Sequence, residues 1–166
     1  MIVLKWMTKE VITVGPDTPI HQIYNIFQKN DIHRVPVMSG EKLVGIVSDR
    51  DVRTALPLFS DKVLPENISE ALERKKASDV MTHEVITIGP LDTIEKAALL
   101  MLNNKFGALP VLNNGQLSGI ITEHDIFEAL LEVTGAKWGV PRLSMVIDDR
   151  PGSVKEVADI IRNYPA

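Results

Sequence analysis

Apolar residues near the start of the chain follow two spacings, and each spacing predicts one kind of element. The run Val11–Val14 is rich in β-branched residues and ends at a Gly-Pro pair, so it predicts a short strand. Ile20, Ile23 and Phe27 then follow at the spacing i, i+3 and i+7, which predicts a helix with one buried face. This part of the chain therefore begins with a strand and continues into an amphipathic helix.

The predicted helix has a start signal, and a predicted hairpin follows it. Thr18 is a residue type that caps helices, and Pro19 suits the first helical position. Two strands, Arg34–Met38 and Leu43–Val47, are joined by a tight turn, and another helix begins near Asp51. The order of elements is strand, helix, strand, strand, helix.

The same pattern returns 74 positions later, so that residues 7–56 match residues 81–130 without a gap. Met7 returns as Met81, and Val35-Pro36-Val37 returns as Leu109-Pro110-Val111. A repeat of this length in a fixed register indicates one structural unit used twice. We expect an α/β (α+β) fold in which two β-α-β-β-α repeats form a pseudo-twofold pair with a ligand groove between them. Neither proline can donate a ladder hydrogen bond, so we expect both at a sheet edge or facing outward.

The composition narrows the classes of function. The chain has 166 residues, a net charge of −4 and no cysteine, which argues against a nucleic-acid binder, a disulfide framework and a thiol nucleophile. No apolar stretch approaches the roughly 20 residues that span a bilayer, and the start of the chain lacks the order of a signal peptide, so we expect a cytoplasmic protein without membrane partners. His-Glu-x-x-His, Gly-x-Ser-x-Gly and glycine-rich phosphate loops are all missing from the sequence. We therefore expect no enzyme, no catalytic cofactor and no metal site.

Three motifs that occur in order resemble paired CBS domains, the Bateman module. They are Ala77-Ser78-Asp79-Val80-Met81-Thr82 before a first strand, the Val-Pro-Val hairpin, and Gly45-Ile46-Val47-Ser48-Asp49-Arg50-Asp51 with its counterpart Gly119-Ile120-Ile121-Thr122-Glu123-His124-Asp125. The first repeat departs from the pattern, because Lys5 stands where the second has Asp79. We expect CBS repeats at 1–58 and 77–134, separated by a linker at 59–76 with a short, solvated helix at Ser69–Lys76.

The resemblance implies a regulator that binds an adenosine-bearing ligand, such as AMP, ADP, ATP or S-adenosylmethionine, in the cleft between the repeats. Asp51 and Asp125 would accept hydrogen bonds from the two ribose hydroxyls, and Ser48 and Thr122 would meet a ribose or phosphate oxygen. The spacing alone also fits helix caps, in which a hydroxyl precedes a carboxylate by three residues. One residue can serve both roles.

Further candidate residues come from the same resemblance. Thr13 and Thr87 match the position beside the adenine, whose faces would pack on apolar neighbours: Ile12, Val35, Ile86 and Leu109. His33 and Arg34 match a position that faces ligand phosphates, while Arg50 and His124 adjoin the two aspartates.

The two repeats differ in their expected phosphate-binding charge. Gly107 and Ala108 replace His33 and Arg34 in the second repeat. We expect one phosphate-competent site and a second that is empty or prefers a less charged ligand. The alternative is that the cations, Arg53 included, form surface ion pairs with Asp31 or Asp49.

The end of the chain follows a different pattern. After a linker at 135–141, residues 142–166 predict a strand at Arg142–Ile147, a turn, and a helix at Val154–Arg162 capped by Ser153. The segment resembles the first half of an ACT domain; the alternative is a short tail that packs or dimerises. Paired CBS repeats before an ACT domain resemble the bacterial acetoin-utilisation accessory proteins.

Together these patterns favour a regulatory adenine-nucleotide sensor that forms a homodimer and controls a metabolic enzyme. The rival interpretation is a ligand-free interaction module with a degenerate cleft, whose function lies in dimer contacts.

Overall fold

The structure is a computed structural model, which describes residues 1–55, 75–139 and 145–163. The chain divides into two compact units, Met1–Leu130 and Leu131–Ala166, and each is described by itself. The first unit holds both repeats. The predicted linker helix at Ser69–Lys76 lies almost entirely outside the described residues.

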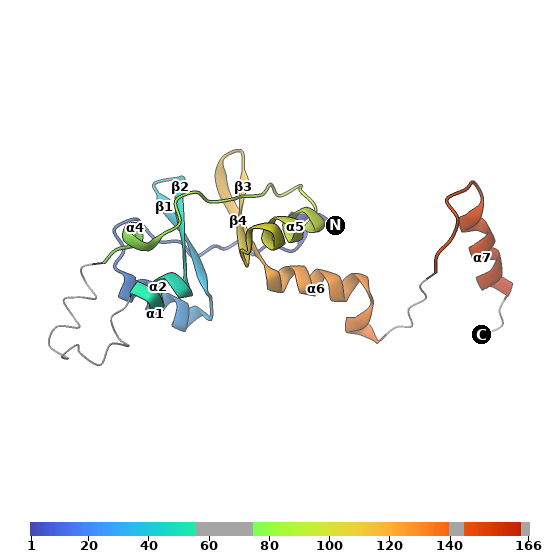
Figure 1. Ribbon diagram of the computed structural model, residues 1–166, viewed down its shortest axis with the longest axis horizontal. Helices are drawn as coiled ribbons and strands as arrows, with labels where there is room; N and C mark the ends of the chain where they lie inside the picture. The colour runs from blue at the N-terminus through green and yellow to red at the C-terminus, as the bar shows by residue number, and fades with distance from the viewer. Residues whose placement is uncertain (56–74, 140–144, 164–166) are drawn as a thin grey trace. The chain divides into compact units, whose positions relative to one another are not determined.

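Each repeat has a helix, a hairpin and a second helix, as the two spacings predict (Figure 1). In the first repeat these are α1 (Ile20–Asn30), β1 (Arg34–Ser39), β2 (Lys42–Ser48) and α2 (Asp49–Ala55). In the second they are α5 (Ile94–Asn104), β3 (Ala108–Asn113), β4 (Gln116–Thr122) and α6 (Glu123–Val133). Both hairpins are antiparallel two-stranded sheets in the same register, with Arg34 opposite Ser48 and Ala108 opposite Thr122.

The predicted first strands are wrong, because only one residue of each run pairs. Val14 forms a parallel bridge to Val37, and Ile88 forms one to Val111. The N–H of Val14 donates to the carbonyl of Pro36 over 3.1 Å. The Gly-Pro turn follows at once, so the chain leaves the sheet after this single bridge.

For the two hairpin prolines the prediction gave two alternatives, a position at a sheet edge or an outward-facing one, and only the first is found. Pro36 lies on β1, and its carbonyl accepts from the N–H of Val14 at the edge of the strand that faces away from β2. Because the N and C=O of one strand residue point the same way, the missing N–H costs no hairpin bond. Pro36 and Pro110 are nevertheless buried and do not face outward.

The predicted cap of α1 is also wrong. Pro19 occupies the N-cap position, and the hydroxyl of Thr18 accepts instead from the N–H of Gly15 over 3.1 Å. This hydroxyl is used to close the turn that precedes the helix. In the second repeat Thr93, the counterpart of Pro19, caps α5 by accepting from the N–H of Lys96 over 3.1 Å.

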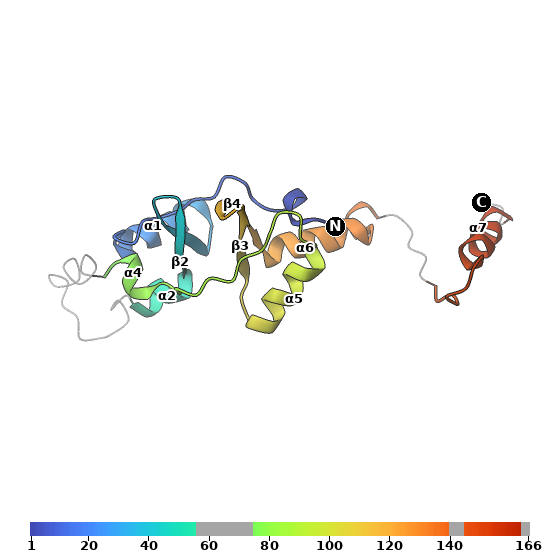
Figure 2. The same ribbon diagram turned by 90° about the horizontal axis from the view of Figure 1, so that it is seen from above.

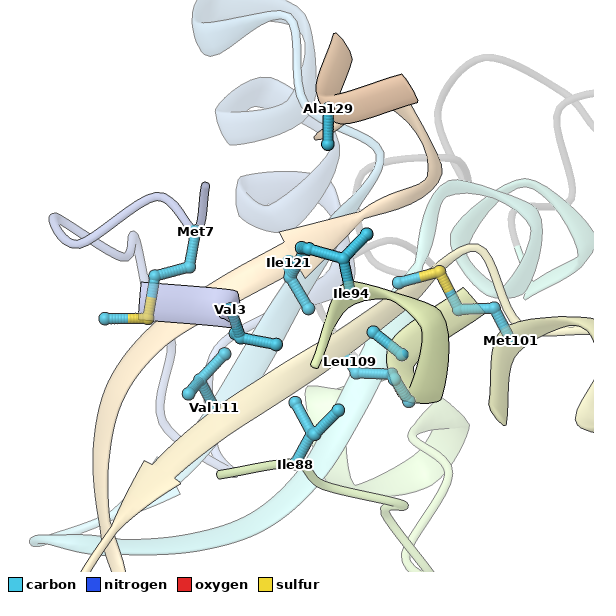
Figure 3. Packing of buried hydrophobic residues seen from close by; sticks show 10 residues of the cluster. Val3, Met7, Ile88, Ile94, Met101, Leu109, Val111, Ile121 and Ala129 are labelled. Carbon is cyan, nitrogen blue, oxygen red and sulfur yellow. The ribbon is translucent and has the colours of Figure 1, made fainter. Parts of the chain in front are cut away.

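The two repeats exchange their leading segments. The 3-10 turn at Val3–Lys5 lies beside α5, and α4 (Ala77–Val80) lies beside α1 and α2 (Figures 1 and 2). Val3 and Met7 belong to the hydrophobic core of the second repeat (Figure 3), whereas Ala77 belongs to that of the first. Each core is therefore completed by the chain that leads into the other repeat.

Backbone hydrogen bonds hold both exchanged segments. The N–H of Val3 donates to the carbonyl of Asp92 over 2.9 Å, and the N–H of Ala77 donates to the carbonyl of Thr18 over 2.8 Å. The entry to the first repeat, which lacks the counterpart of Asp79, is a 3-10 turn rather than an α-helical one. In α4 that aspartate accepts from the N–H of Lys76 over 2.8 Å.

Two glycines allow the exchanged chain to approach closely. A Cβ at Gly119 would lie 2.6 Å from the sulfur of Met7 and 2.9 Å from the carbonyl oxygen of Thr8. A Cβ at Gly45 would likewise lie 2.8 Å from Cγ of Met81. Glycine is required at these two positions because the crossing chain occupies the space of a side chain.

The second unit confirms one of its two predicted elements. The helix is present as α7 (Ser153–Asn163), which begins at Ser153 itself. The hydroxyl of Ser153 is buried without a hydrogen-bond partner, so the predicted cap is wrong. Residues 145–147 are not a strand, and 142–144 lie outside the described residues. Across the described segments, no helix has both the length and the apolar character that crossing a membrane requires.

The close approach at Gly119 predicts a destabilising effect of a single methyl group. In Gly119→Ala the new Cβ must displace backbone at Thr8, and we expect the free energy of unfolding to fall by about 1–3 kcal/mol. Urea unfolding measures the change. Gly15→Ala is the matched control, because a Cβ there lies 3.8 Å from its nearest neighbour. Equal stability of the two variants would contradict the packing of the exchanged segment.

Candidate functional site

The turn from β2 into α2 is held by one carboxylate oxygen. Oδ2 of Asp51 accepts from the N–H of Ser48 over 2.8 Å and from its hydroxyl over 2.6 Å. The hydroxyl oxygen of Ser48 in turn accepts from the N–H of Asp51 over 3.3 Å. The predicted capping interaction is therefore present at the start of α2.

The turn from β4 into α6 repeats this arrangement. Oδ2 of Asp125 accepts from the N–H of Thr122 over 2.7 Å and from its hydroxyl over 2.8 Å. Within the described part of the chain, Oδ1 of neither aspartate accepts a hydrogen bond. Each cap thus uses half of its carboxylate and leaves the other oxygen available.

Both aspartates line clefts between the repeats. The Asp51 cleft has a volume of about 670 Å³ and is lined from the other repeat by Val85, Ile86 and Lys105, among others. The Asp125 cleft has a volume of about 730 Å³ and is lined from the other repeat by Val11, Ile12 and Asp31, among others. Both volumes lie in the range of about 300–1,000 Å³ that is typical of small-molecule sites.

The two clefts are related by the internal repeat. Most residues that line one have their counterparts, 74 positions away, in the lining of the other; among these pairs are Ile46 and Ile120, Ser48 and Thr122, Asp51 and Asp125, Val85 and Val11, and Ile86 and Ile12. The pairing is what a pseudo-twofold axis between the repeats produces. The groove expected from the sequence is therefore two clefts.

Eight of the ten candidate site residues line a cleft. Ser48, Arg50 and Asp51 lie in the Asp51 cleft; Thr122, His124 and Asp125 lie in the Asp125 cleft; His33 and Arg34 line both.

The structure does not bring Thr13 and Thr87 to the clefts. Their neighbours Ile12 and Ile86 line them instead. Val35 and Leu109, expected to pack against an adenine, are fully buried in the cores and present no surface to a ligand.

The basic residues divide between ion pairs and the clefts. Arg53 donates to Asp49 at 2.8 Å, so the ion-pair alternative is right for this residue. The hydrogen bond and the negative charge of Asp49 raise the pKa of Arg53. Neither Arg34 nor Arg50 pairs with a carboxylate among the residues that the structure describes.

Sequence reasoning missed the contribution of Gly107 and Glu123. A Cβ on Gly107 would lie 2.7 Å from Nη2 of Arg34 and 2.9 Å from Oε2 of Glu123. The glycine that replaces His33 in the second repeat therefore makes room for the guanidinium of the first. The signal in the sequence was the difference at equivalent positions of the repeats, where His33-Arg34 of the first corresponds to the small residues Gly107-Ala108 of the second.

The described residues contain no group of three His, Asp or Glu side chains placed to hold a metal ion. The clefts combine apolar walls with hydroxyl, carboxylate and basic side chains. Such a set can bind a polar organic molecule through hydrogen bonds and charge.

Comparison with known proteins finds close relatives in sequence. The CBS domain family matches residues 3–58 and 77–132. A CBS domain-containing protein of Dictyostelium discoideum is 34% identical over 138 residues, which are 80% of this chain and 93% of that protein.

Three solved structures are similar in fold. AcuB of Vibrio cholerae, named for acetoin utilization, has a TM-score of 0.68 at 26% identity and covers 86% of this chain and 98% of its own. The CBS domain pair of protein MJ0100, in complex with 5′-methylthioadenosine and S-adenosyl-L-methionine, has a TM-score of 0.66 at 25% identity over 82% of this chain and 98% of its own. CBSX2 in complex with AMP has a TM-score of 0.66 at 29% identity over 80% and 97%.

The family match coincides with the two halves that exchange their leading segments and enclose the paired clefts. The chain belongs to the CBS domain family and carries two CBS domains in tandem.

Proposed function

We propose that this chain is a regulatory module that senses an adenosine-bearing ligand and controls a partner metabolic protein. The observation that carries the proposal is the pair of equivalent clefts, each with an aspartate whose cap uses only one carboxylate oxygen. The complexes of MJ0100 and CBSX2 support the ligand class, since both contain adenosine derivatives.

The half-used carboxylate suits a ribose. Two adjacent hydroxyls can donate to a carboxylate, and hydrogen bonds to a charged acceptor are stronger than neutral ones. The cap holds Asp51 in place before a ligand arrives, which reduces the entropy lost on binding. The apolar side chains of Val85 and Ile86 across the same cleft are suited to a base.

Regulation would follow from the position of each cleft between repeats. A ligand there contacts both repeats, so it favours the arrangement of repeats for which its affinity is higher. A partner protein that contacts the module in one arrangement would then respond to the ligand. The likeness to AcuB supports a partner in acetoin utilisation.

The ribose assignment predicts a specific loss of affinity. Asp51→Asn and Asp125→Asn keep an oxygen for the cap but remove the charge, and we expect about tenfold weaker binding of the adenosine ligand in the altered cleft. Calorimetric titration of nucleotide-free protein with AMP, ADP, ATP and S-adenosylmethionine measures it.

Asp79→Asn is the matched control for this experiment, because Asp79 caps α4 in the same way and lines neither cleft. Its affinity is expected to equal that of the unaltered protein. An equal loss in Asp79→Asn, or no loss in either cleft variant, would refute ribose recognition by these aspartates.

A second candidate function, a dimerisation module, rests on exposed apolar residues in the second repeat. Leu99 and Leu102 on α5 are 58% and 75% exposed, and Phe127 on α6 is 63% exposed. Their counterparts in the first repeat are the exposed polar residues Asn25, Gln28 and Arg53. A twofold homodimer in which second repeats meet would bury apolar surface against apolar surface.

This arrangement predicts cross-linking from one repeat only. The chain has no cysteine, so Leu102→Cys and Gln28→Cys each introduce a single thiol. With a short bifunctional thiol reagent we expect a covalent dimer from Leu102→Cys and little from Gln28→Cys, read on a denaturing gel. Equal cross-linking of the two, or a monomer by light scattering, would refute the dimer through second repeats.

A further inference from the structure

The two clefts share one strongly basic side chain. Arg34 begins β1 at the boundary between the repeats, and it lines both the Asp51 cleft and the Asp125 cleft. Its guanidinium lies against Gly107 together with the carboxylate of Glu123, which also lines both clefts. The second repeat has Ala108 at the position of Arg34, so the guanidinium has no symmetry mate.

The remaining charges of the two clefts differ at equivalent positions. Lys105 of the Asp51 cleft stands where the Asp125 cleft has Asp31, which reverses the charge. Both residues end their helices in the left-handed conformation, with φ of 57° and 51°, so the backbone places them alike. Arg50 of the Asp51 cleft stands where the other has His124.

The acidic residues do not offset this difference. Each cleft has its capping aspartate, Glu123, and one glutamate from the facing segment, Glu84 or Glu10. Asp49 also lines the Asp51 cleft, but its Oδ2 is paired with Arg53. The Asp51 cleft therefore has three permanent cations against four carboxylates, one of which is paired with Arg53, whereas the Asp125 cleft has Arg34 alone against four carboxylates.

We propose that the two clefts take ligands of opposite charge and are coupled through Arg34. The Asp51 cleft binds a phosphate-bearing adenosine nucleotide, and the Asp125 cleft binds a phosphate-free adenosine compound, most tightly a cationic one. The proposal rests on the proposed function, because it divides the adenosine ligands between the two clefts.

The coupling follows from the single guanidinium. A phosphate in the Asp51 cleft engages Arg34 through paired hydrogen bonds, since guanidinium groups match phosphate oxygens in this way. The Asp125 cleft then loses its one permanent cation and its field becomes more negative. A second phosphate is repelled there, while a cationic ligand binds more tightly, and linkage makes the effect reciprocal.

Calorimetry with AMP and S-adenosylmethionine as probes tests the division. We expect one strong site for each probe. Asp51→Asn should weaken the binding of AMP, and Asp125→Asn should weaken the binding of S-adenosylmethionine. Prior saturation with AMP is expected to increase the affinity for S-adenosylmethionine about tenfold. Two equal AMP sites, or competition between the probes for one site, overturns the proposal.

Variants of Arg34 test the coupling. Arg34→Ala is expected to weaken the binding of AMP at least tenfold and to abolish the effect of AMP on the affinity for S-adenosylmethionine. Arg34→Lys is expected to restore part of the AMP affinity and part of the coupling. Gly107→Ala, which forces the guanidinium away, is expected to act in the same direction as Arg34→Ala. Lys29→Ala is the matched control, because it removes one exposed cation that lines neither cleft.

Thermal melting of each variant without ligand separates binding from folding. Coupling that persists in Arg34→Ala overturns the role of this residue. Absence of binding by AMP, ADP, ATP and S-adenosylmethionine alike overturns the proposed function itself. Binding of AMP and S-adenosylmethionine with the wrong division, or of neither while another nucleotide binds, overturns only the present inference.

Discussion

The exchange of leading segments is the interaction on which the rest of the structure depends. Met7 packs against Gly119 and Met81 is placed in the same way against Gly45, so each hairpin carries on its surface the chain that enters the other repeat. Val3 and Ala77 complete the opposite cores. The pairing of repeats is therefore a matter of shared hydrophobic burial, which is the main source of folding free energy. The clefts exist because this pairing holds two similar surfaces face to face.

Within that frame, the chemistry of each cleft comes from local structure. A strand that turns directly into a helix needs a cap, and Ser48 with Asp51 supplies it through one carboxylate oxygen. The structural requirement and the binding group are thus the same side chain. The difference between the clefts comes from positions without such a requirement, such as Lys105 and Asp31, where charge can change while the backbone stays the same.

The sequence predicts those features of this molecule that depend on interactions between residues close together in the chain, and it predicts long-range contacts poorly. The helices and hairpins are predicted because their apolar periods and turn residues are local signals. At Val14 and Thr18 the structure depends on which of several possible hydrogen-bond partners each residue has. Strand propensity and helix-capping propensity alone therefore gave wrong predictions there. The family resemblance identified eight residues that line the clefts, but it also named Thr13 and Thr87, which line neither, and it did not indicate the contact of Arg34 with Gly107. That contact joins two repeats and has no local signature.

The exchange has a consequence for how the module loses its structure. The segments that line the clefts, Glu10–Ile12 and Glu84–Ile86, begin three residues after Met7 and Met81, which hold the exchanged chain in place. Opening one repeat therefore withdraws side chains from the core of the other. The two halves should behave in native-state hydrogen exchange as a single cooperative unit, with amides of both cores opening together. A molecule held in either cleft would then slow exchange in both cores at once.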